Sequence, residues 1–181
     1  VLGEDLPLFL YGHSMGGLEV LYYGLFSENT LAGIIATAPT LDVSNFSKVK
    51  IALAKKGSSL FPKMTIATGL NTEMLSRDPH VVETYRNDPL VHGLTSFRLA
   101  ESSLKAMQRV LENPTSWQQP LLLMHGIEDH ITSINGTETF YQSANGDITY
   151  IRWEDLFHEI HNEPEKEQVL QKMADWILSR V

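Results

Sequence analysis

Residues 8–18, LFLYGHSMGGL, decide how the rest of the chain is interpreted. An apolar run ends abruptly in Gly12-His13-Ser14-Met15-Gly16, which fits the pattern G-x-S-x-G. This pattern is typical of a sharp strand-to-helix turn that presents a serine oxygen from a strained backbone. Such a turn brings Gly12 and Gly16 close together, so only hydrogen is expected to fit at both positions. The helix that follows points its free N–H groups at the same place, where they favour developing negative charge.

Strand and helix patterns flank this turn. Residues 7–11 predict a buried strand, because apolar side chains follow one another without alternation. Residues 16–28 carry a helical pattern, and residues 31–38 form a second continuous apolar run. Strand, helix and strand in this order predict a right-handed βαβ unit with parallel strands. This context favours a serine placed for chemistry over a glycine-rich turn with an incidental serine.

The pattern changes after Pro39 and stays different as far as residue 117. This stretch shows helical patterns and no convincing strand. Three helices are expected: from Ser44 or Asn45 to Lys56 with a stop at Gly57, from Asp78-Pro79 to about Asn87, and over residues 96–112. Helices inserted between parallel strands are typical of a cap over an active site, although they could instead flank the sheet.

Strand patterns return in the last third of the chain. Residues 121–124 are a continuous apolar run, residues 137–144 look helical, and residues 147–153 alternate like a strand near a sheet edge. A last helix is expected to begin at Asn162, with Glu165 as its capping-box partner. The whole pattern predicts an α/β fold with a mostly parallel sheet flanked by helices.

The composition narrows the classes of partner and chemistry. The chain has 181 residues, 43% hydrophobic and 20% charged, which suits one globular domain with a core. Its formal net charge of −8 argues against nucleic acid or an anionic membrane surface as a main partner. It has no cysteine, hence no disulfide and no thiol chemistry, and no apolar run of transmembrane length.

Three residues stand in the right order for nucleophilic catalysis. A serine nucleophile needs a base, and the base needs an acid that orients it. In α/β-hydrolases the chain order is serine, acid and histidine, each in a loop at the carboxyl end of a strand. Ser14, Asp129 and His158 each follow a predicted strand in this order. They are therefore the predicted nucleophile, acid and base.

Other histidines compete for the role of the base. His161 is the main rival to His158, but it lies closer to the last helix. His13 is expected to point into the sheet as a structural side chain. His125 stands at a strand end, where it could hydrogen-bond locally, and His130 directly follows the predicted acid, which is poor geometry for a bridging base.

Acidic residues raise two further alternatives. Asp155 and Asp147 compete with Asp129 as the acid, although Asp147 begins its strand and so lies at the wrong end. The histidines and carboxylates of this region also suggest a metal centre. However, residues 158–161 are one residue too short for H-E-x-x-H, so neither a metal nor a cofactor is predicted.

Six stretches are spread over nearly the whole chain: LFLYGHSMGG (8–17), APTL (38–41), LSRD (75–78), DPLV (88–91), HGIEDHIT (125–132) and HEIHNE (158–163). Together they resemble the monoacylglycerol lipase and lysophospholipase branch of the α/β-hydrolases, a serine aminopeptidase S33-like group. The resemblance implies that Ser14, Asp129 and His158 are the nucleophile, acid and base. It also implies a core of residues 1–39 and 118–181, with residues 40–117 as a helical cap that shapes an apolar acyl-binding pocket.

The chain departs from this family at its start. Only thirteen residues precede Ser14, whereas the family places several strands there, with a His-Gly loop that donates one oxyanion-hole N–H. We therefore expect the C-terminal part of an α/β-hydrolase, with the N–H of Met15 as the remaining oxyanion donor. Loss of one such donor costs about 10²–10³ in kcat. The strand before Ser14 would also become an unprotected sheet edge, through which self-association is expected.

The resemblance implies a serine carboxylic-ester hydrolase that cleaves an acyl chain from a monoacylglycerol or lysophospholipid through an acyl-enzyme. The expected partners are small acyl esters, with membrane or micelle contact through the cap and no nucleic acid. A cytoplasmic or membrane-peripheral location is favoured. Two alternatives stay open: a truncated, weakly active chain that binds acyl ligands or a partner, and a thioesterase, peptidase or perhydrolase on the same scaffold.

Overall fold

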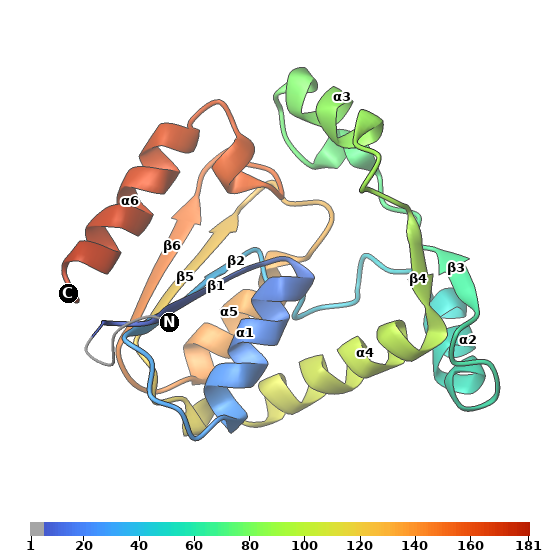
Figure 1. Cartoon of the computed structure of the whole chain (residues 1–181), viewed down its shortest axis with the longest axis horizontal. Coiled ribbons are helices and arrows are strands. Elements are labelled where there is room, and N and C mark those ends of the chain that lie inside the picture. The colour runs from blue at the N-terminus through green and yellow to red at the C-terminus, as the bar shows by residue number, and fades with distance from the viewer. Residues whose placement is uncertain (1–5) are drawn as a thin grey trace.

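A four-stranded parallel sheet with helices on both faces forms the centre of the molecule in the computed structural model, which describes residues 6–181 (Figure 1). Its strands lie in the spatial order β1, β2, β5, β6, and each neighbouring pair runs parallel. The predicted α/β fold is therefore confirmed. The strands are β1 (Phe9–His13), β2 (Gly33–Thr37), β5 (Leu121–Gly126) and β6 (Ile148–Trp153).

The two central strands build a separate core on each face of the sheet, because successive side chains point to opposite faces. Ile34 and Leu123 pack on one face beneath helices α1, α4 and α5. Ile35 and Leu122 pack on the other face beneath α6. Both faces are thus covered, which explains why these strands read as continuous apolar runs. The covering helices are α1 (Met15–Phe26), α4 (Phe97–Glu112), α5 (Ile134–Ser143) and α6 (Lys166–Leu178).

The segment between β2 and β5 extends away from the sheet, and its α2 and β3 lie at the far end of the molecule (Figure 1). β3 and β4 form a short antiparallel pair, so the expectation that residues 40–117 hold no strand is wrong. Each of these strands has three residues, too few for an alternating pattern to show. The segment contains α2 (Lys48–Leu60), β3 (Thr65–Ala67), a 3₁₀ turn η1 (Thr72–Met74), α3 (Pro79–Asn87) and β4 (Leu94–Ser96).

The expected bounds of α2 are wrong at both ends. Its cap is Ser47, whose hydroxyl accepts a hydrogen bond from the N–H of Lys50. The helix also continues through Gly57, because this glycine serves packing and does not end the helix. A Cβ on Gly57 would lie 2.5 Å from the ring of Phe97 on α4. The expected start of α3 is confirmed, since Asp78 caps the helix and proline occupies its first position.

Helix α4 joins this segment to the core. It packs against both α1 and α2. Its C-terminal half contributes Val110, which is fully buried with Leu18 and Leu21 of α1. The division into a core and a cap therefore stays a prediction, and α4 takes part in both. A 3₁₀ turn η2 (Pro114–Ser116) leads from α4 towards β5.

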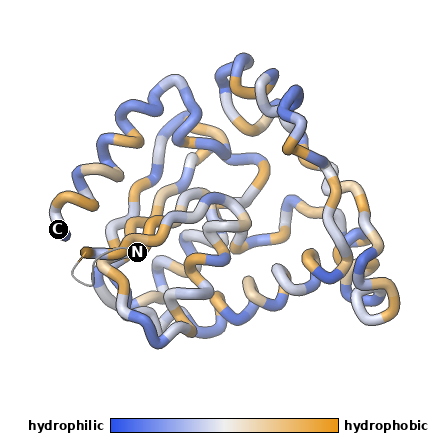
Figure 2. The backbone as a smooth tube through the Cα atoms, viewed as in Figure 1, coloured by the Kyte–Doolittle hydropathy of each residue, from blue (hydrophilic) through white to orange (hydrophobic). Residues whose placement is uncertain are grey.

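The last helix begins later than expected. Residues Ile160–Asn162 form a separate 3₁₀ turn, η3, and α6 starts at Lys166. The predicted capping box is wrong because the carboxylate of Glu165 pairs with Arg77, far away in the sequence, and makes no bond to a backbone N–H of the helix. Apolar segments follow the central strands and recur at the far end of α2 (Figure 2). Within residues 6–181, no helix is both long enough and apolar enough to cross a bilayer.

Candidate active site

The chain turns sharply at Ser14, between β1 and α1. Ser14 has φ 56° and ψ −118°, a strained conformation that is uncommon for a residue with a side chain. Its N–H donates to the carbonyl of Thr37 at 2.9 Å, and its own carbonyl accepts from the N–H groups of Leu18 and Thr40 at 3.1 and 3.0 Å. These bonds hold Ser14 at the carboxyl ends of β1 and β2.

Glycine is required at only one of the two positions that the G-x-S-x-G pattern names. A Cβ on Gly12 would lie 2.1 Å from the carbonyl oxygen of Gly16, which leaves room for hydrogen alone. At Gly16 a Cβ would meet no described atom within 4 Å apart from the adjoining residues and the backbone of its own helix, so the expectation that only hydrogen fits there is wrong. The backbone of Gly16 is what crowds Gly12, and a side chain on Gly16 would point away from that contact. Gly17 is crowded too, because a Cβ there would lie 2.9 Å from Cα of Pro39.

Asp129 and His158 form a buried pair at the ends of β5 and β6. Nδ1 of His158 lies 2.7 Å from Oδ2 of Asp129. The other oxygen, Oδ1, accepts the N–H groups of Ile131 and Thr132 at 2.8 and 3.0 Å. The structure therefore brings the predicted acid and base into direct contact, on a carboxylate that the following turn holds in place.

The surroundings of Asp129 favour its ionised form. Burial would raise the pKa of this carboxyl, but hydrogen bonds from His125 and His158 outweigh burial and hold the pKa below its usual value. The hydroxyl of Thr132 donates to Oδ2 as well, at 2.8 Å. An ionised acceptor next to Nδ1 keeps the proton of neutral His158 on that nitrogen, which leaves Nε2 able to accept another.

His13 lies against the base, next to Ser14 in the chain. Its Nδ1 is 3.0 Å from Oγ1 of Thr37, and its ring centroid is 4.6 Å from that of His158 and 4.8 Å from that of His161. Burial, with repulsion from both neighbouring histidines, lowers the pKa of His13 to about 2. This histidine is therefore neutral at neutral pH and bonds to β2, as expected for a structural side chain.

The rival candidates for base and acid make other contacts. Nδ1 of His161 lies 3.3 Å from the hydroxyl of Tyr11. Asp147 pairs with Arg180 at 2.9 Å, at the start of β6. The side chain of His130 is exposed. No group of three or more histidine or acidic side chains in the described part of the chain is arranged to hold a metal ion.

Glu163 is a further residue of the site, and no local pattern in the sequence marks it. Its carboxylate is fully buried and accepts the N–H of Phe157, the residue before His158, at 2.8 Å. It also accepts the backbone N–H of Arg77 at 3.2 Å and the Nε–H of the same residue at 3.1 Å. The loop of His158 is thus tied to the inserted segment. The only signal in the sequence was the presence of Glu163 and Arg77 in two of the stretches that carry the family resemblance.

A parallel sheet, a strained serine between β1 and α1, and a buried aspartate–histidine pair at the ends of β5 and β6 define an α/β-hydrolase. The chain belongs to the family described as serine aminopeptidase S33 (Hydrolase_4), whose model matches residues 2–165.

Similar proteins include lipases. The crystal structure of the Paleococcus ferrophilus monoacylglycerol lipase matches with a TM-score of 0.93 at 30% identity, covering 97% of this chain and 69% of that one. The Mycolicibacterium smegmatis monoacylglycerol lipase is 30% identical over 97% of this chain and 64% of its own length. Phospholipase YtpA of Bacillus subtilis is 32% identical over 92% of this chain and 66% of its own. The chain thus spans just under two thirds of these two curated relatives.

Proposed function

We propose that this chain carries the nucleophile, acid and base of a serine carboxylic-ester hydrolase that releases an acyl chain from a monoacylglycerol or a lysophospholipid. The observation that supports the proposal most directly is the 2.7 Å contact between Nδ1 of His158 and Oδ2 of Asp129. This buried pair and the strained Ser14 all follow parallel strands, whose carboxyl ends meet at one edge of the sheet. The monoacylglycerol lipases and the phospholipase among the relatives support a lipid ester as the substrate.

The proposed reaction uses Ser14 as nucleophile, His158 as base and acid, and Asp129 as the partner of His158. Oγ of Ser14 attacks the ester carbonyl while Nε2 of His158 takes the hydroxyl proton. Asp129 stabilises the imidazolium that results, and the N–H of Met15, at the start of α1, donates to the oxyanion. His158 then gives its proton to the leaving alcohol, which leaves an acyl group on Ser14. A water molecule, deprotonated by His158, hydrolyses this acyl-enzyme and releases the fatty acid.

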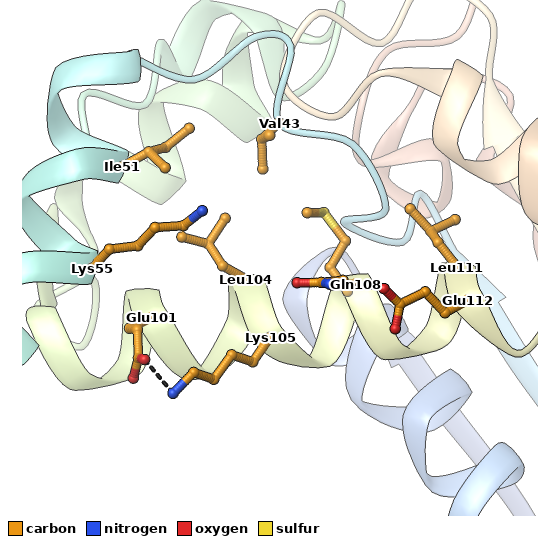
Figure 3. A pocket seen from close by; sticks show the side chains of 10 residues that line it. Val43, Ile51, Lys55, Glu101, Leu104, Lys105, Gln108, Leu111 and Glu112 are labelled. Atoms are coloured by element: carbon orange, nitrogen blue, oxygen red, sulfur yellow. Dashed lines mark hydrogen bonds and ion pairs between the residues drawn. The ribbon is translucent and has the colours of Figure 1, made fainter.

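An open pocket of about 610 Å³ between α2 and α4 is the proposed site of the acyl chain (Figure 3). The segment after β2 leads from Ser14 to this pocket, because Thr40 bonds to the carbonyl of Ser14 and Val43 lines the pocket three residues later. Lys105 pairs with Glu101 along α4 (Figure 3). The apolar lining suits an alkyl chain and consists of Val43, Ile51, Leu104, Met107 and Leu111.

The outer face of α2 is the proposed contact with a lipid surface. Val49, Leu53 and Leu60 recur along one side of the helix with exposed fractions of 69%, 49% and 74%. Residues 43–72 contain five lysines and no acidic residue, against the overall charge of the chain. Apolar side chains flanked by lysines suit an interfacial helix. The double substitution Leu53→Ser and Leu60→Ser should reduce the fraction of protein that sediments with phospholipid vesicles. Leu170→Ser, which changes an exposed leucine on α6, should leave that fraction unchanged.

Labelling with a fluorophosphonate probe tests the proposed nucleophile. The wild-type protein should react covalently at Ser14 and release fatty acid from a monoacylglycerol. Ser14→Ala should lose both the label and the activity, and Ser102→Ala, an exposed serine on α4, should keep both. Labelling that persists in Ser14→Ala would refute the assignment.

A further inference from the structure

A second histidine contacts the carboxylate that pairs with His158. His125 lies in β5 and is fully buried. Its Nε2 is 3.1 Å from Oδ2 of Asp129 and 3.2 Å from the carbonyl oxygen of Thr132. Its Nδ1 is 2.9 Å from the hydroxyl oxygen of Thr137, on α5. The oxygen of Asp129 that accepts from His158 is therefore shared with a second imidazole.

The neighbours of His125 determine where its proton resides. The two oxygens near Nε2, one from Asp129 and one from the carbonyl of Thr132, can only accept hydrogen bonds, so Nε2 carries a proton. In the neutral ring Nδ1 then accepts from the hydroxyl of Thr137. Both nitrogens have partners, so no polar atom of the buried ring is left unsatisfied. The preceding side chains of β5, from Leu121 to Met124, are all apolar and buried. An apolar side chain would therefore suit the packing at position 125, and the polar contacts of the imidazole need another explanation.

We propose that His125 is a positioning residue that acts on the base through Asp129, by fixing Oδ2 and withdrawing part of its negative charge from His158. This inference rests on the proposed function. Oδ2 accepts from the hydroxyl of Thr132 at 2.8 Å and lies 2.7 Å from Nδ1 of His158 and 3.1 Å from Nε2 of His125, whose N–H is directed to the carbonyl of Thr132 as well. Each of these contacts takes part of the charge on this oxygen. Without His125, more charge would face protonated His158, which would hold its proton to higher pH.

Other titratable groups surround the pair but do not replace this contact. His13, at the end of β1, packs against the rings of both His158 and His161. Glu159 follows His158 in the loop and lies near His161. Glu128 and His130, beside Asp129 in the chain, are exposed. Among residues 6–181, His125 and His158 are the titratable side chains that lie within 3.1 Å of the Asp129 carboxylate.

Two substitutions separate the two contacts of His125. Glutamine places an amide nitrogen as many bonds from Cα as Nε2, so His125→Gln keeps a donor towards Asp129. Asparagine places its amide at the depth of Nδ1, so His125→Asn keeps the contact with Thr137 and loses the one with Asp129. In His125→Asn, the acid limb of the kcat/KM profile should move up by roughly half a pH unit to one unit. The kcat should fall about tenfold with KM unchanged, and His125→Gln should restore both towards wild type.

Rates are divided by the fraction of protein that reacts with the fluorophosphonate probe, so loss of folded enzyme alone cannot move the limb. If the acid limb of the kcat/KM profile lies at the wild-type pH in both variants, or moves by the same amount in both, the inference is wrong. NMR titration of the Cε1–H of His158 gives the same midpoint without turnover, so the inference can fail or hold independently of the proposed function. Should His125→Asn not fold, Thr137→Val removes the hydroxyl bonded to Nδ1 and should produce a smaller shift in the same direction. No shift there would also overturn the inference.

Discussion

Arg77 donates both its backbone N–H and its Nε–H to the buried carboxylate of Glu163, across 86 residues of sequence. The same carboxylate accepts the N–H of Phe157, directly before His158. The N–H of Glu159, directly after His158, donates to the carbonyl of Leu75 at 2.8 Å. The loop that presents the proposed base is therefore held on both sides by contacts that involve the inserted segment.

Substitution of Glu163 should weaken both the fold and the reaction. Glu163→Gln keeps the shape but removes the charge opposite Arg77, so we expect a loss of about 2 kcal/mol in the free energy of unfolding. The kcat should fall while KM changes little, because the loop of His158 loosens and the proposed acyl pocket does not change. Urea unfolding and steady-state kinetics measure the two effects. Glu165→Gln is the matched control, because it removes a half-exposed partner of the same arginine and should cost less than about 1 kcal/mol.

The stability of the protein should fall as the pH drops below 6.5, because His13 is neutral in the folded state. Its pKa is lowered to about 2 by burial, against an ordinary value of 6.5. Between these values the unfolded chain binds a proton that the folded chain does not, so acid favours unfolding by about 1.4 kcal/mol per pH unit. The lowered pKa of His161 acts in the same direction.

His13→Asn tests this dependence, because asparagine keeps a polar group near Thr37 but does not titrate. Urea unfolding at about pH 7.5 and about pH 5 should show that wild type loses roughly 2 kcal/mol more than the variant. His80→Asn, at an exposed position, should retain the wild-type dependence. An equal loss of stability in wild type and His13→Asn would contradict the assigned cause.

Local patterns in the sequence predicted most of the sheet but not the contacts that fix the site. The strands at 33–37 and 121–126 are buried on both faces. Their sequences are continuous apolar runs, which is the pattern expected for such strands. The strands at 65–67 and 94–96 are three residues long and pair with each other, so no local pattern shows them. The start of α6 differs from the expected one, and Glu165 turns to a partner 88 residues away in the sequence.

For the candidate site as well, local patterns predict some residues and long-range contacts determine others. The order of Ser14, Asp129 and His158 along the chain was readable, because each follows a strand whose pattern is local. The roles inferred for His125 and Glu163 depend on contacts between residues that only the folded chain brings together. A sequence does not show which residue a buried histidine or glutamate will contact. The roles of His125 and Glu163 could therefore be inferred only from the structure.

Alanine at the two glycines of the turn should have opposite consequences. Gly12→Ala places a Cβ 2.1 Å from a backbone oxygen of Gly16, so we expect a loss of more than about 3 kcal/mol or failure to fold. Gly16→Ala meets open space in the first turn of α1, where alanine is favoured by about 0.5–1 kcal/mol over glycine. Thermal unfolding of both variants checks this difference. A Gly16→Ala variant as unstable as Gly12→Ala would contradict the open space found at position 16.

Filling the pocket between α2 and α4 should impair long substrates and spare short ones. Leu104→Trp places an indole where the acyl chain is proposed to lie, and each methylene kept out of an apolar site costs about 0.8 kcal/mol. Displacement of two methylenes should therefore lower kcat/KM about tenfold for a long-chain monoacylglycerol. A short nitrophenyl ester, which does not reach the pocket, should be hydrolysed at the wild-type rate. Ser102→Trp adds the same ring to an exposed position of α4 and should change neither rate; an equal effect of Leu104→Trp on both esters would place the acyl chain elsewhere.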